Sequence, residues 1–388
     1  MHEFPAPSAQ AQAHSEQLVA LLRREIRDGG GSIPFSRYME LCLYSPGYGY
    51  YSAGARKFGA AGDFVTSPEI SPLFGRCLAQ TCRGVLTSLE GGRILEFGAG
   101  TGKLAATMLV ELERLGCLPE RYLILERSGE LRARQRETLQ LMAPRLAERV
   151  AWLDGLPEGG FRGILLANEV LDAMPVERFR WNGGVERWYV ECHDEAFAWR
   201  TGEAHDPDLV AAVQRLVADP GLSPGYVSEV NLQLAPWLMS IGGILERGLV
   251  LLIDYGYPRR EYYHPQRRSG TLMCHYRHRV HDDPFLWPGL QDITAHVDFT
   301  AVAEAGSAAG LDVLGYTSQA HFLLDCGLDR LLLAAGPTDS ADYLRQVRDA
   351  KTLILPGEMG ERFKCIGLGR GIESAVPGFG GQDFRCRL

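Results

Sequence analysis

The stretch Arg93–Ala105, RILEFGAGTGKLA, constrains the fold of this chain more than any other part of its sequence. A short apolar run containing Glu96 leads into glycines at positions 98, 100 and 102, and a helical pattern follows. Glycine permits left-handed backbone and lets a ligand approach the main chain closely. A strand, a glycine turn and a helix in this order are typical of the first unit of a nucleotide-binding α/β fold.

The same rhythm continues beyond this stretch. Apolar runs of strand length occur at 122–126, 150–154 and 163–170, a helical pattern follows the first of them, and another apolar run begins at Gly248. Strands that alternate with helices predict an α/β fold with a mostly parallel sheet covered on both faces. Near the end, residues 352–371 are expected to form a strand, a turn and a second strand.

Two regions interrupt the alternation. Residues 176–240 contain the turn Asn182–Gly184 between aromatic runs, which predicts an inserted β-hairpin. Residues 257–300 form a second long aromatic region. We therefore divide the chain into an N-terminal region, 1–90, and a Rossmann-like domain, 91–388, that carries these two insertions.

The N-terminal region is expected to begin with a helix from Ser15 to about Gly29, because its leucines recur at helical spacing. The tract Gly47–Gly75 is long, aromatic and flanked by glycines. Long loops with these features are usually functional. We predict that this tract is a lid over the ligand.

Composition excludes several classes of function. The chain has 388 residues and a net charge of −8, so bulk attraction to nucleic acid is not expected. Its nine cysteines form no CxxC pair, which argues against a zinc site or a disulfide framework. No uncharged run approaches the roughly 18 apolar residues of a membrane span. The first residues lack the apolar core of a signal peptide, so a cytoplasmic location is expected.

The glycine loop is compatible with two ligands. Dinucleotide-binding loops have the spacing GxGxxG, whereas this loop is GxGxG with Lys103 at the third position of that pattern. Glu96 would repel a pyrophosphate at short range. S-adenosylmethionine instead carries a cationic amino group and a sulfonium, so Glu96 favours it. A tight turn that binds no ligand is the remaining alternative.

Two more carboxylates end predicted strands. Glu126 is placed to accept hydrogen bonds from both ribose hydroxyls, and a surface acid at a strand end is the alternative. Asp154 is placed near an adenine edge, but the following glycine explains it equally as a turn former. Ligands of parallel sheets bind at the carboxyl ends of the strands, where these acids fall.

Seven motifs in this order carry a family resemblance. They are GDFVTSPEISPLFG, ILEFGAGTGKLA, ANEVLDAMPV, SEVN, IDYGY, HVDFTA and GERFKCIGLGRG. From about Ile33 to Gly371 the chain resembles the MidA family of class I S-adenosylmethionine-dependent methyltransferases, which includes a mitochondrial complex I assembly factor that methylates protein arginine. The resemblance implies a seven-stranded sheet and S-adenosyl-L-methionine as cofactor. Within these motifs we predict Thr66, Ser67 and Asn168 as further cofactor-binding residues.

The segment after the fourth predicted strand is the expected place for the methyl acceptor. It lacks the NPPY-like tetrapeptide of many nucleobase-methylating enzymes and offers Glu169 and Asp172 instead. Paired carboxylates suit a guanidinium, which has five donors in a planar fork. In the alternative interpretation, Glu169 binds the cofactor and Asp172 caps a helix.

Further catalytic candidates lie in two other motifs. Asp254 ends the fifth predicted strand and is expected to face the same cleft. His296 and Asp298 could form a hydrogen-bonded pair near the acceptor, with His275 as another candidate. Asp298 is equally explained as a helix cap, and an aromatic-loop histidine more often has a structural role.

The sequence leaves three functions open. The first is a protein arginine methyltransferase; the resemblance implies that its substrate is a peripheral-arm subunit of NADH–quinone oxidoreductase, modified during assembly. The second is an assembly chaperone that binds the cofactor without catalysis. The third is a methyltransferase for a small molecule or RNA. The acidic composition and the missing NPPY-like tetrapeptide argue against RNA but not against a small molecule. We expect no metal ion and no nucleic-acid partner.

Overall fold

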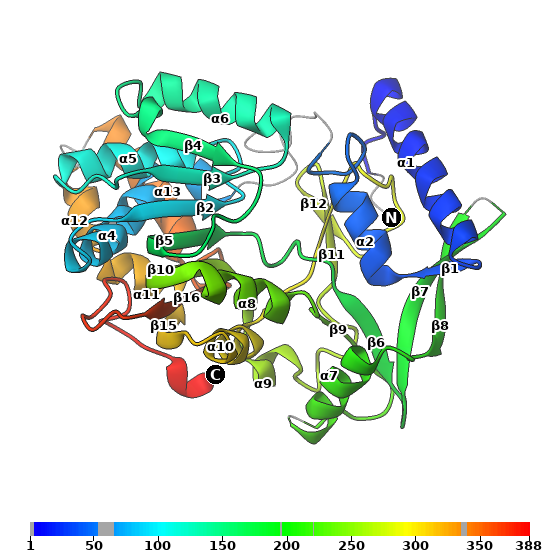
Figure 1. Cartoon of the computed structure of the whole chain (residues 1–388). Coiled ribbons are helices and arrows are strands. Elements are labelled where there is room, and N and C mark those ends of the chain that lie inside the picture. Colours follow the sequence, from blue (N-terminus) through cyan, green and yellow to red (C-terminus); the bar gives the residue numbers. More distant parts are fainter. Residues whose placement is uncertain (1–3, 53–65, 195, 220, 335–339) are drawn as a thin grey trace. The chain divides into compact units, whose positions relative to one another are not determined.

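The computed structural model describes residues 4–52, 66–194, 196–219, 221–334 and 340–388 (Figure 1). The chain forms two compact units, each assembled from three segments. The ribbon unit comprises Met1–Phe64, Asp172–Pro236 and Tyr257–Asp298. The sheet unit comprises Val65–Leu171, Trp237–Gly256 and Phe299–Leu388.

The sheet unit is built on strands in the order β15-β16-β10-β5-β2-β3-β4. Their bounds are β2 (Arg93–Phe97), β3 (Tyr122–Leu125), β4 (Val150–Leu153), β5 (Phe161–Asn168), β10 (Leu245–Tyr257), β15 (Asp312–Ser318) and β16 (Phe363–Arg370). Neighbours from β4 to β10 are parallel, whereas β16 is antiparallel to both β10 and β15. The predicted α/β fold with a mostly parallel sheet is therefore confirmed.

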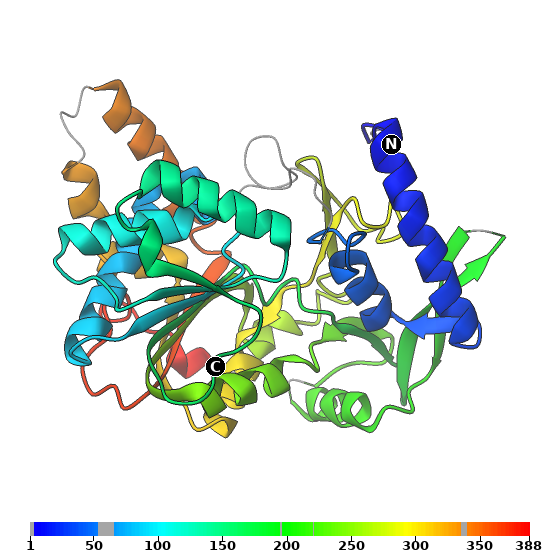
Figure 2. The same cartoon turned by 45° about the horizontal axis from the view of Figure 1, so that its top comes forward.

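Helices cover both faces of this sheet. They are α3 (Ser67–Ile70), α4 (Pro72–Ser88), α5 (Lys103–Arg114), α6 (Gly129–Met142), α8 (Leu234–Ile244), α10 (Phe299–Ala308), α11 (Gln319–Asp325), α12 (Leu328–Leu333) and α13 (Ala341–Ile354), with short 3-10 turns η1 (Ala147–Arg149) and η2 (Arg385–Arg387). Ile94 and Ile164 share a core with α4 and α5. On the opposite face Phe97 packs edge-on against Trp237 of α8, at 5.4 Å between ring centroids. Figures 1 and 2 show α5 and α8 on opposite sides of the strands.

The ribbon unit is mainly antiparallel. Its larger sheet contains β1 (Ser32–Pro34), β6 (Glu177–Trp181), β7 (Val185–His193), β8 (Ala196–Glu203) and β9 (Tyr226–Val230), and its smaller sheet contains β11 (Met273–Tyr276), β12 (Arg279–His281) and β13 (Asp292–Thr294). The other elements are α1 (Ala9–Asp28), α2 (Phe35–Tyr44), α7 (Pro207–Ala218), α9 (Arg259–Tyr262) and β14 (Val297–Asp298). β6 and β7 pair antiparallel across the Asn182–Gly184 turn, so the predicted hairpin is confirmed.

A buried charge organises the centre of the ribbon unit. The Arg178 guanidinium lies 4.7 Å from the Trp188 ring and 4.8 Å from the Trp199 ring, and its Nε is 3.7 Å from Glu229. The Glu229 carboxylate is fully buried and accepts a 2.7 Å hydrogen bond from the Thr271 amide. Burial raises the pKa of Glu229, while Arg178 and Thr271 act against this rise. The SEVN motif therefore serves to join β9 to the loop before β11.

Three details differ from the sequence-based expectations. The first helix begins at Ala9 rather than at Ser15, because Ser8 caps its N-terminus. The apolar residues 352–354 end helix α13 and do not form a strand; Leu353 belongs to the buried face of that helix. Residues 66–90 cluster with the sheet unit rather than with the N-terminal region, because α4 packs into the sheet core. Residues 53–65 of the expected lid lie outside the described residues.

Within the described residues, no helix is long and apolar enough to span a membrane. All nine cysteines are free thiols. In the same part of the chain, no group of three or more His, Cys, Asp and Glu side chains is arranged to hold a metal ion.

Candidate functional site

The three loop glycines all adopt left-handed backbone but have different surroundings. Their φ angles are +62° at Gly98, +51° at Gly100 and +85° at Gly102. A Cβ at Gly102 would lie 3.0 Å from Cα of Gln135, so this glycine lets α6 pack closely on the loop. A Cβ at Gly100 would meet no described atom within 4 Å. Gly100 therefore borders open space, as expected of a position that faces a ligand.

The Glu96 carboxylate is buried on the face of the sheet that α4 and α5 cover. It follows Ile94 by two residues, so both side chains project to the α4–α5 side of β2. The side chain is almost fully buried, and the Tyr122 hydroxyl donates a 2.7 Å hydrogen bond to it. Burial raises the pKa of Glu96 to about 7, against the lowering effect of Tyr122. Both protonation states of Glu96 are therefore accessible near neutral pH.

Gln135 of α6 connects the glycine loop to the end of β3. Its Nε2 donates to the Gly100 carbonyl at 3.1 Å and to Glu126 Oε2 at 3.4 Å, and its Oε1 accepts from the Trp152 indole at 2.8 Å. Burial raises the pKa of Glu126, whose Oε1 accepts from the Ser128 amide at 2.8 Å. Sequence reasoning missed Gln135. The sequence signal that could have identified it is a glutamine one helical turn before Leu139, on the face of α6 that is buried.

Asp154 lies at the end of β4 with an exposed side chain. Arg132 donates to it at 2.6 Å, and also donates to the Glu126 and Leu153 carbonyls at 2.6 and 2.8 Å. Asp154 is thus one of the groups that hold Arg132 across the ends of β3 and β4.

The segment that follows β5 has an unusual backbone. Glu169 has φ +54°, which is rare for a residue with a side chain. Its Oε1 accepts hydrogen bonds from the Ser67 amide at 3.2 Å and from Asn168 Nδ2 at 3.1 Å. Asn168 Oδ1 is buried and accepts no hydrogen bond from the residues that the structure describes.

Asp254 fixes the same segment from the neighbouring strand. Its fully buried Oδ2 accepts from the amides of Val170 and Leu171 at 3.1 and 2.9 Å, and its Oδ1 from that of Tyr255 at 2.9 Å. Carboxylate acceptors bind backbone N–H groups more strongly than neutral acceptors do. The position of Glu169 is therefore set by the end of β5, by Asp254 of β10 and by α3; Asp254 does not end its strand as predicted, because β10 continues to Tyr257.

The short helix α3 supplies two contacts of its own. Thr66 is its N-cap, and Ser67 is fully buried with its hydroxyl 3.3 Å from Gln319 Oε1. Glu69, which sequence reasoning did not single out, accepts from Thr101 Oγ1 at 2.5 Å and is paired with Lys103. The TSPEIS motif thereby contacts both the glycine loop and the segment after β5.

Asp172 belongs to the ribbon unit and is buried there. Its charge and that of Asp292 add to burial in raising the pKa of the Tyr44 and Tyr51 hydroxyls, so both acids lie near both tyrosines. The tyrosine rings stack at 5.6 Å, and Tyr51 donates to Asp292 at 2.8 Å. Asp292 and the two tyrosines were not predicted. A single carboxylate in an aromatic region gives no sequence signal for such a cluster.

The remaining candidates also lie in the ribbon unit. The His296 ring stacks on Tyr257 at 5.4 Å with 6° between the ring planes. Asp298 is 3.3 Å from Arg259 Nε. His275 is part of β11, and burial lowers its pKa.

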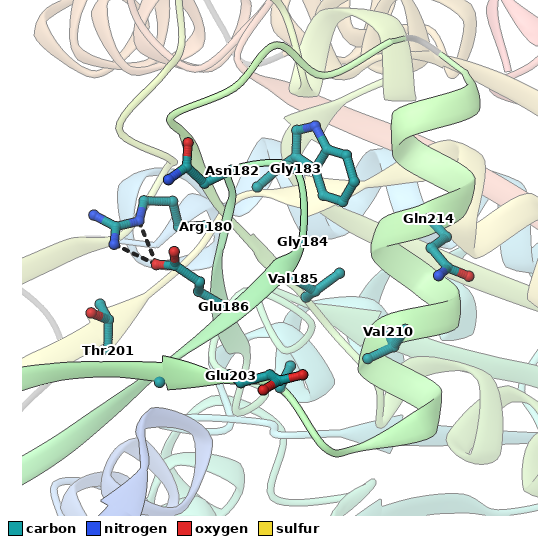
Figure 3. A pocket seen from close by; sticks show the side chains of 13 residues that line it. Arg180, Asn182, Gly183, Gly184, Val185, Glu186, Thr201, Glu203, Val210 and Gln214 are labelled. Carbon is teal, nitrogen blue, oxygen red and sulfur yellow. Dashed lines mark hydrogen bonds and ion pairs between the residues drawn. The ribbon is translucent and has the colours of Figure 1, made fainter.

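A pocket of about 580 Å³ occupies a different part of the ribbon unit (Figure 3). It lies between the β6–β7 turn, the end of β8 and helix α7, and its rim includes an Arg180–Glu186 ion pair with a 2.7 Å hydrogen bond. None of the predicted site residues lines it. This pocket is therefore separate from the predicted site residues.

Comparison with known proteins decides the family. Residues 73–317 match the model of a family of S-adenosyl-L-methionine-dependent methyltransferases. The chain belongs to this methyltransferase family. It is similar to the protein arginine methyltransferase NDUFAF7 homolog of Drosophila melanogaster, with 28% identity over 96% of this chain and 89% of that protein. Human NDUFAF7, also named a protein arginine methyltransferase, is 25% identical over 87% of this chain and 80% of its own length.

A solved structure agrees with this membership. A Burkholderia thailandensis protein, crystallised with S-adenosyl-homocysteine, is 48% identical over the full length of both chains and superposes with a TM-score of 0.95. The methyltransferase described here therefore uses S-adenosyl-L-methionine as its cofactor.

The geometry of the methyltransferase fits this cofactor. S-adenosylmethionine presents donors on its amino group, ribose and adenine, and the carboxyl ends of β3 and β5 carry the acceptors Glu126 and Asn168 Oδ1. Gly100 leaves space beside the loop that a Cβ would occupy. These oxygens are of the kind that can accept hydrogen bonds from such donors.

Proposed function

We propose that this methyltransferase methylates an arginine side chain of a protein, and that the protein is a peripheral-arm subunit of NADH–quinone oxidoreductase modified during assembly. The names of the similar proteins support arginine as the acceptor. The complex I substrate rests on the resemblance to the MidA family. One structural observation carries the proposal: a carboxylate, Glu169, held in a rare backbone conformation at the end of β5.

We assign cofactor-binding roles to residues at or near the carboxyl ends of the strands. When bound, S-adenosylmethionine supplies an electrophilic methyl group on its sulfonium. We propose that the Gly98, Gly100 and Gly102 backbone accommodates the cofactor and that Glu126 accepts from its ribose hydroxyls. Glu96 compensates the cationic amino group.

Asn168 offers its Oδ1 to a cofactor donor. The α3 residues Thr66 and Ser67 border the same segment, since Ser67 contacts Glu169. Asp154 is proposed for the adenine edge on its strand-end position alone.

The acceptor roles follow from charge. A guanidinium keeps its proton above about pH 12 and its nitrogens are poorly nucleophilic. A carboxylate that binds two of its N–H groups concentrates the positive charge at that end and directs another nitrogen toward the methyl donor. We assign this task to Glu169, with Asp172 as a second carboxylate beside Tyr44 and Tyr51. Positioning of this kind can supply most of the rate enhancement of an in-line displacement.

Asp254 and His296 receive indirect roles in this proposal. The Asp254 carboxylate holds the amides of Val170 and Leu171, which makes it a positioning residue for Glu169. His296, whose ring stacks on Tyr257, is proposed to orient the acceptor.

Methyl transfer to a peptide with a single arginine tests the proposal. The Ser67 amide and Asn168 both donate to one Glu169 oxygen, so the oxygen of a glutamine can keep both bonds. We expect Glu169→Gln to lower the rate of methyl transfer by about 10- to 100-fold, which corresponds to the free energy of one charge-assisted hydrogen bond. Cofactor affinity should change little. Asp172→Asn is expected to behave alike, and Glu158→Gln, an exposed acid, to be neutral.

Mass spectrometry of the peptide and titration with S-adenosylhomocysteine separate the outcomes. Equal methylation of a lysine peptide would remove the arginine assignment. Full activity in both charge-neutral variants would rule out the proposed role of Glu169 and Asp172 in binding the acceptor. Tight cofactor binding without transfer to any complex I subunit would favour an assembly chaperone.

A further inference from the structure

The carboxylate of Glu69 lies at the start of helix α5. It accepts a 2.5 Å hydrogen bond from Thr101 Oγ1 and is paired with the Lys103 ammonium. The Glu69 side chain is 8% exposed, whereas that of Lys103 is 42% exposed. An acid from α3 is therefore buried against the two residues that flank Gly102.

This location is one that attracts anions. The N-terminus of a helix carries a partial positive charge, and α5 begins at Lys103 with a glycine N-cap that offers no side chain. A glycine loop, a lysine and a hydroxyl at a helix start are the groups with which other α/β proteins bind nucleotide phosphates. The loop of this chain has all three groups.

Glu69 cannot easily leave this position. Its amide donates to the Thr66 carbonyl at 2.9 Å, and the preceding Ser67 is fully buried with its amide bound to Glu169. The carboxylate is thus a fixed anion supplied by the protein itself.

We infer that Glu69 is a specificity-determining residue: its carboxylate fills the anion position at the start of α5 and so excludes nucleotides that carry phosphate. S-adenosylmethionine carries no phosphate group that would compete with the Glu69 carboxylate for this position. A pyrophosphate at the same place would bring a second anion against a buried carboxylate, and like charges at that distance repel.

Replacing Glu69 tests this inference by equilibrium binding of adenosine, ADP and NAD to the full chain. In wild-type protein we expect ADP to bind no better than adenosine. In Glu69→Ala the phosphate can reach Thr101 and Lys103, and the affinity for ADP relative to adenosine should rise about 10- to 100-fold, as for a charge-assisted contact. Glu69→Gln, which is nearly isosteric, should show a rise of the same direction.

Two controls make the test specific. Glu158→Ala removes one exposed negative charge of the same unit and should leave the ADP-to-adenosine ratio unchanged. Adding Lys103→Met to Glu69→Ala should cancel the gain. Thermal melting confirms that each variant is folded, and Glu69→Gln replaces Glu69→Ala if the alanine variant does not fold.

A ratio that does not rise in the folded variants overturns the inference. The inference also fails if S-adenosylhomocysteine affinity falls while ADP affinity stays constant, because Glu69 would then only position the loop. A gain that persists after Lys103→Met overturns it as well, since the phosphate would then bind elsewhere.

Discussion

Glu96 is both a predicted cofactor-binding residue and a part of the buried core of the sheet unit. A strand of the central sheet places it, by alternation, on the face that α4 and α5 cover. The hydrogen bond from the Tyr122 hydroxyl compensates only part of the cost of burying this carboxylate, and its pKa rises to about 7. The cost of keeping Glu96 ionised in the absence of ligand therefore lowers the stability of the folded state.

The pH dependence of stability should report this cost. The pKa of Glu96 rises from 4.5 in a solvated chain to about 7 in the fold. A raised carboxyl pKa means that the unfolded chain loses its proton first, so the stability contribution present below pH 4.5 is lost between pH 4.5 and about pH 7. At about 1.4 kcal/mol per pKa unit, the loss is about 3 kcal/mol.

Urea unfolding of wild type and Glu96→Gln across this range measures it. The variant should lack this part of the decline, so the two unfolding free energies should converge as the pH falls. Parallel profiles would contradict the raised pKa.

At the scale of elements, the turn after β5 depends on a strand beside it. Asp254 of β10 binds the amides of Val170 and Leu171 directly after Glu169. The left-handed backbone of Glu169 costs about 1 kcal/mol or more. Such a conformation persists because the neighbouring contacts fix it, and Asp254 provides two of them.

Asp254→Asn should therefore loosen this turn. We expect amide exchange at Val170 and Leu171 to accelerate by about tenfold or more, because charge-assisted bonds to the backbone become neutral ones. Asp325→Asn is a matched control: its carboxylate also binds two amides, those of Gly378 and Gly380, at 2.8 and 3.0 Å. The control should leave exchange at Val170 and Leu171 unchanged. Equal exchange in wild type and Asp254→Asn would contradict the positioning role.

The elements differ in how well the sequence predicts them. Strands such as β2 and β3 are short, apolar and bounded by turn residues, so their period and length predict them. The first of the two strands expected within 352–371 was wrong, because residues 352–354 end helix α13 and a run of three or four apolar residues is equally consistent with a helix end. The acids at the strand ends were predictable from the fold rule for parallel sheets. The burial of Glu96 and the contacts of Gln135 depend on tertiary packing, which local pattern does not contain.

At the scale of the whole molecule, the two units alternate along the sequence. Each contains three segments, so the chain passes between them several times. The aromatic and hairpin signals predicted insertions at 176–240 and 257–300, and the later ribbon-unit segments are Asp172–Pro236 and Tyr257–Asp298. The first boundary was harder, because α4 follows the N-terminal tract without a break in pattern yet buries its apolar face in the sheet core. Asp172 likewise follows Glu169 by three residues but belongs to the other unit.

Ligand binding should stabilise the molecule selectively. A ligand at 100 times its Kd adds about 2.7 kcal/mol to the free energy of unfolding. We expect S-adenosylhomocysteine to raise Tm and NAD at equal concentration to leave it unchanged. In Gly100→Val the side chain occupies the open space beside the loop, so the ligand-induced shift should vanish. Differential scanning fluorimetry measures all three. A larger shift with NAD would contradict the loop assignment.

Trp152 gives the chain an intrinsic optical probe. The sheet unit has two of the six tryptophans, and the Trp152 indole donates to Gln135, which in turn binds Gly100 and Glu126. Indole emission responds to hydrogen bonding and polarity around the ring. Any ligand that draws Glu126 or the Gly100 carbonyl away from Gln135 therefore alters the fluorescence of Trp152, and occupancy of the loop can be followed in unlabelled protein.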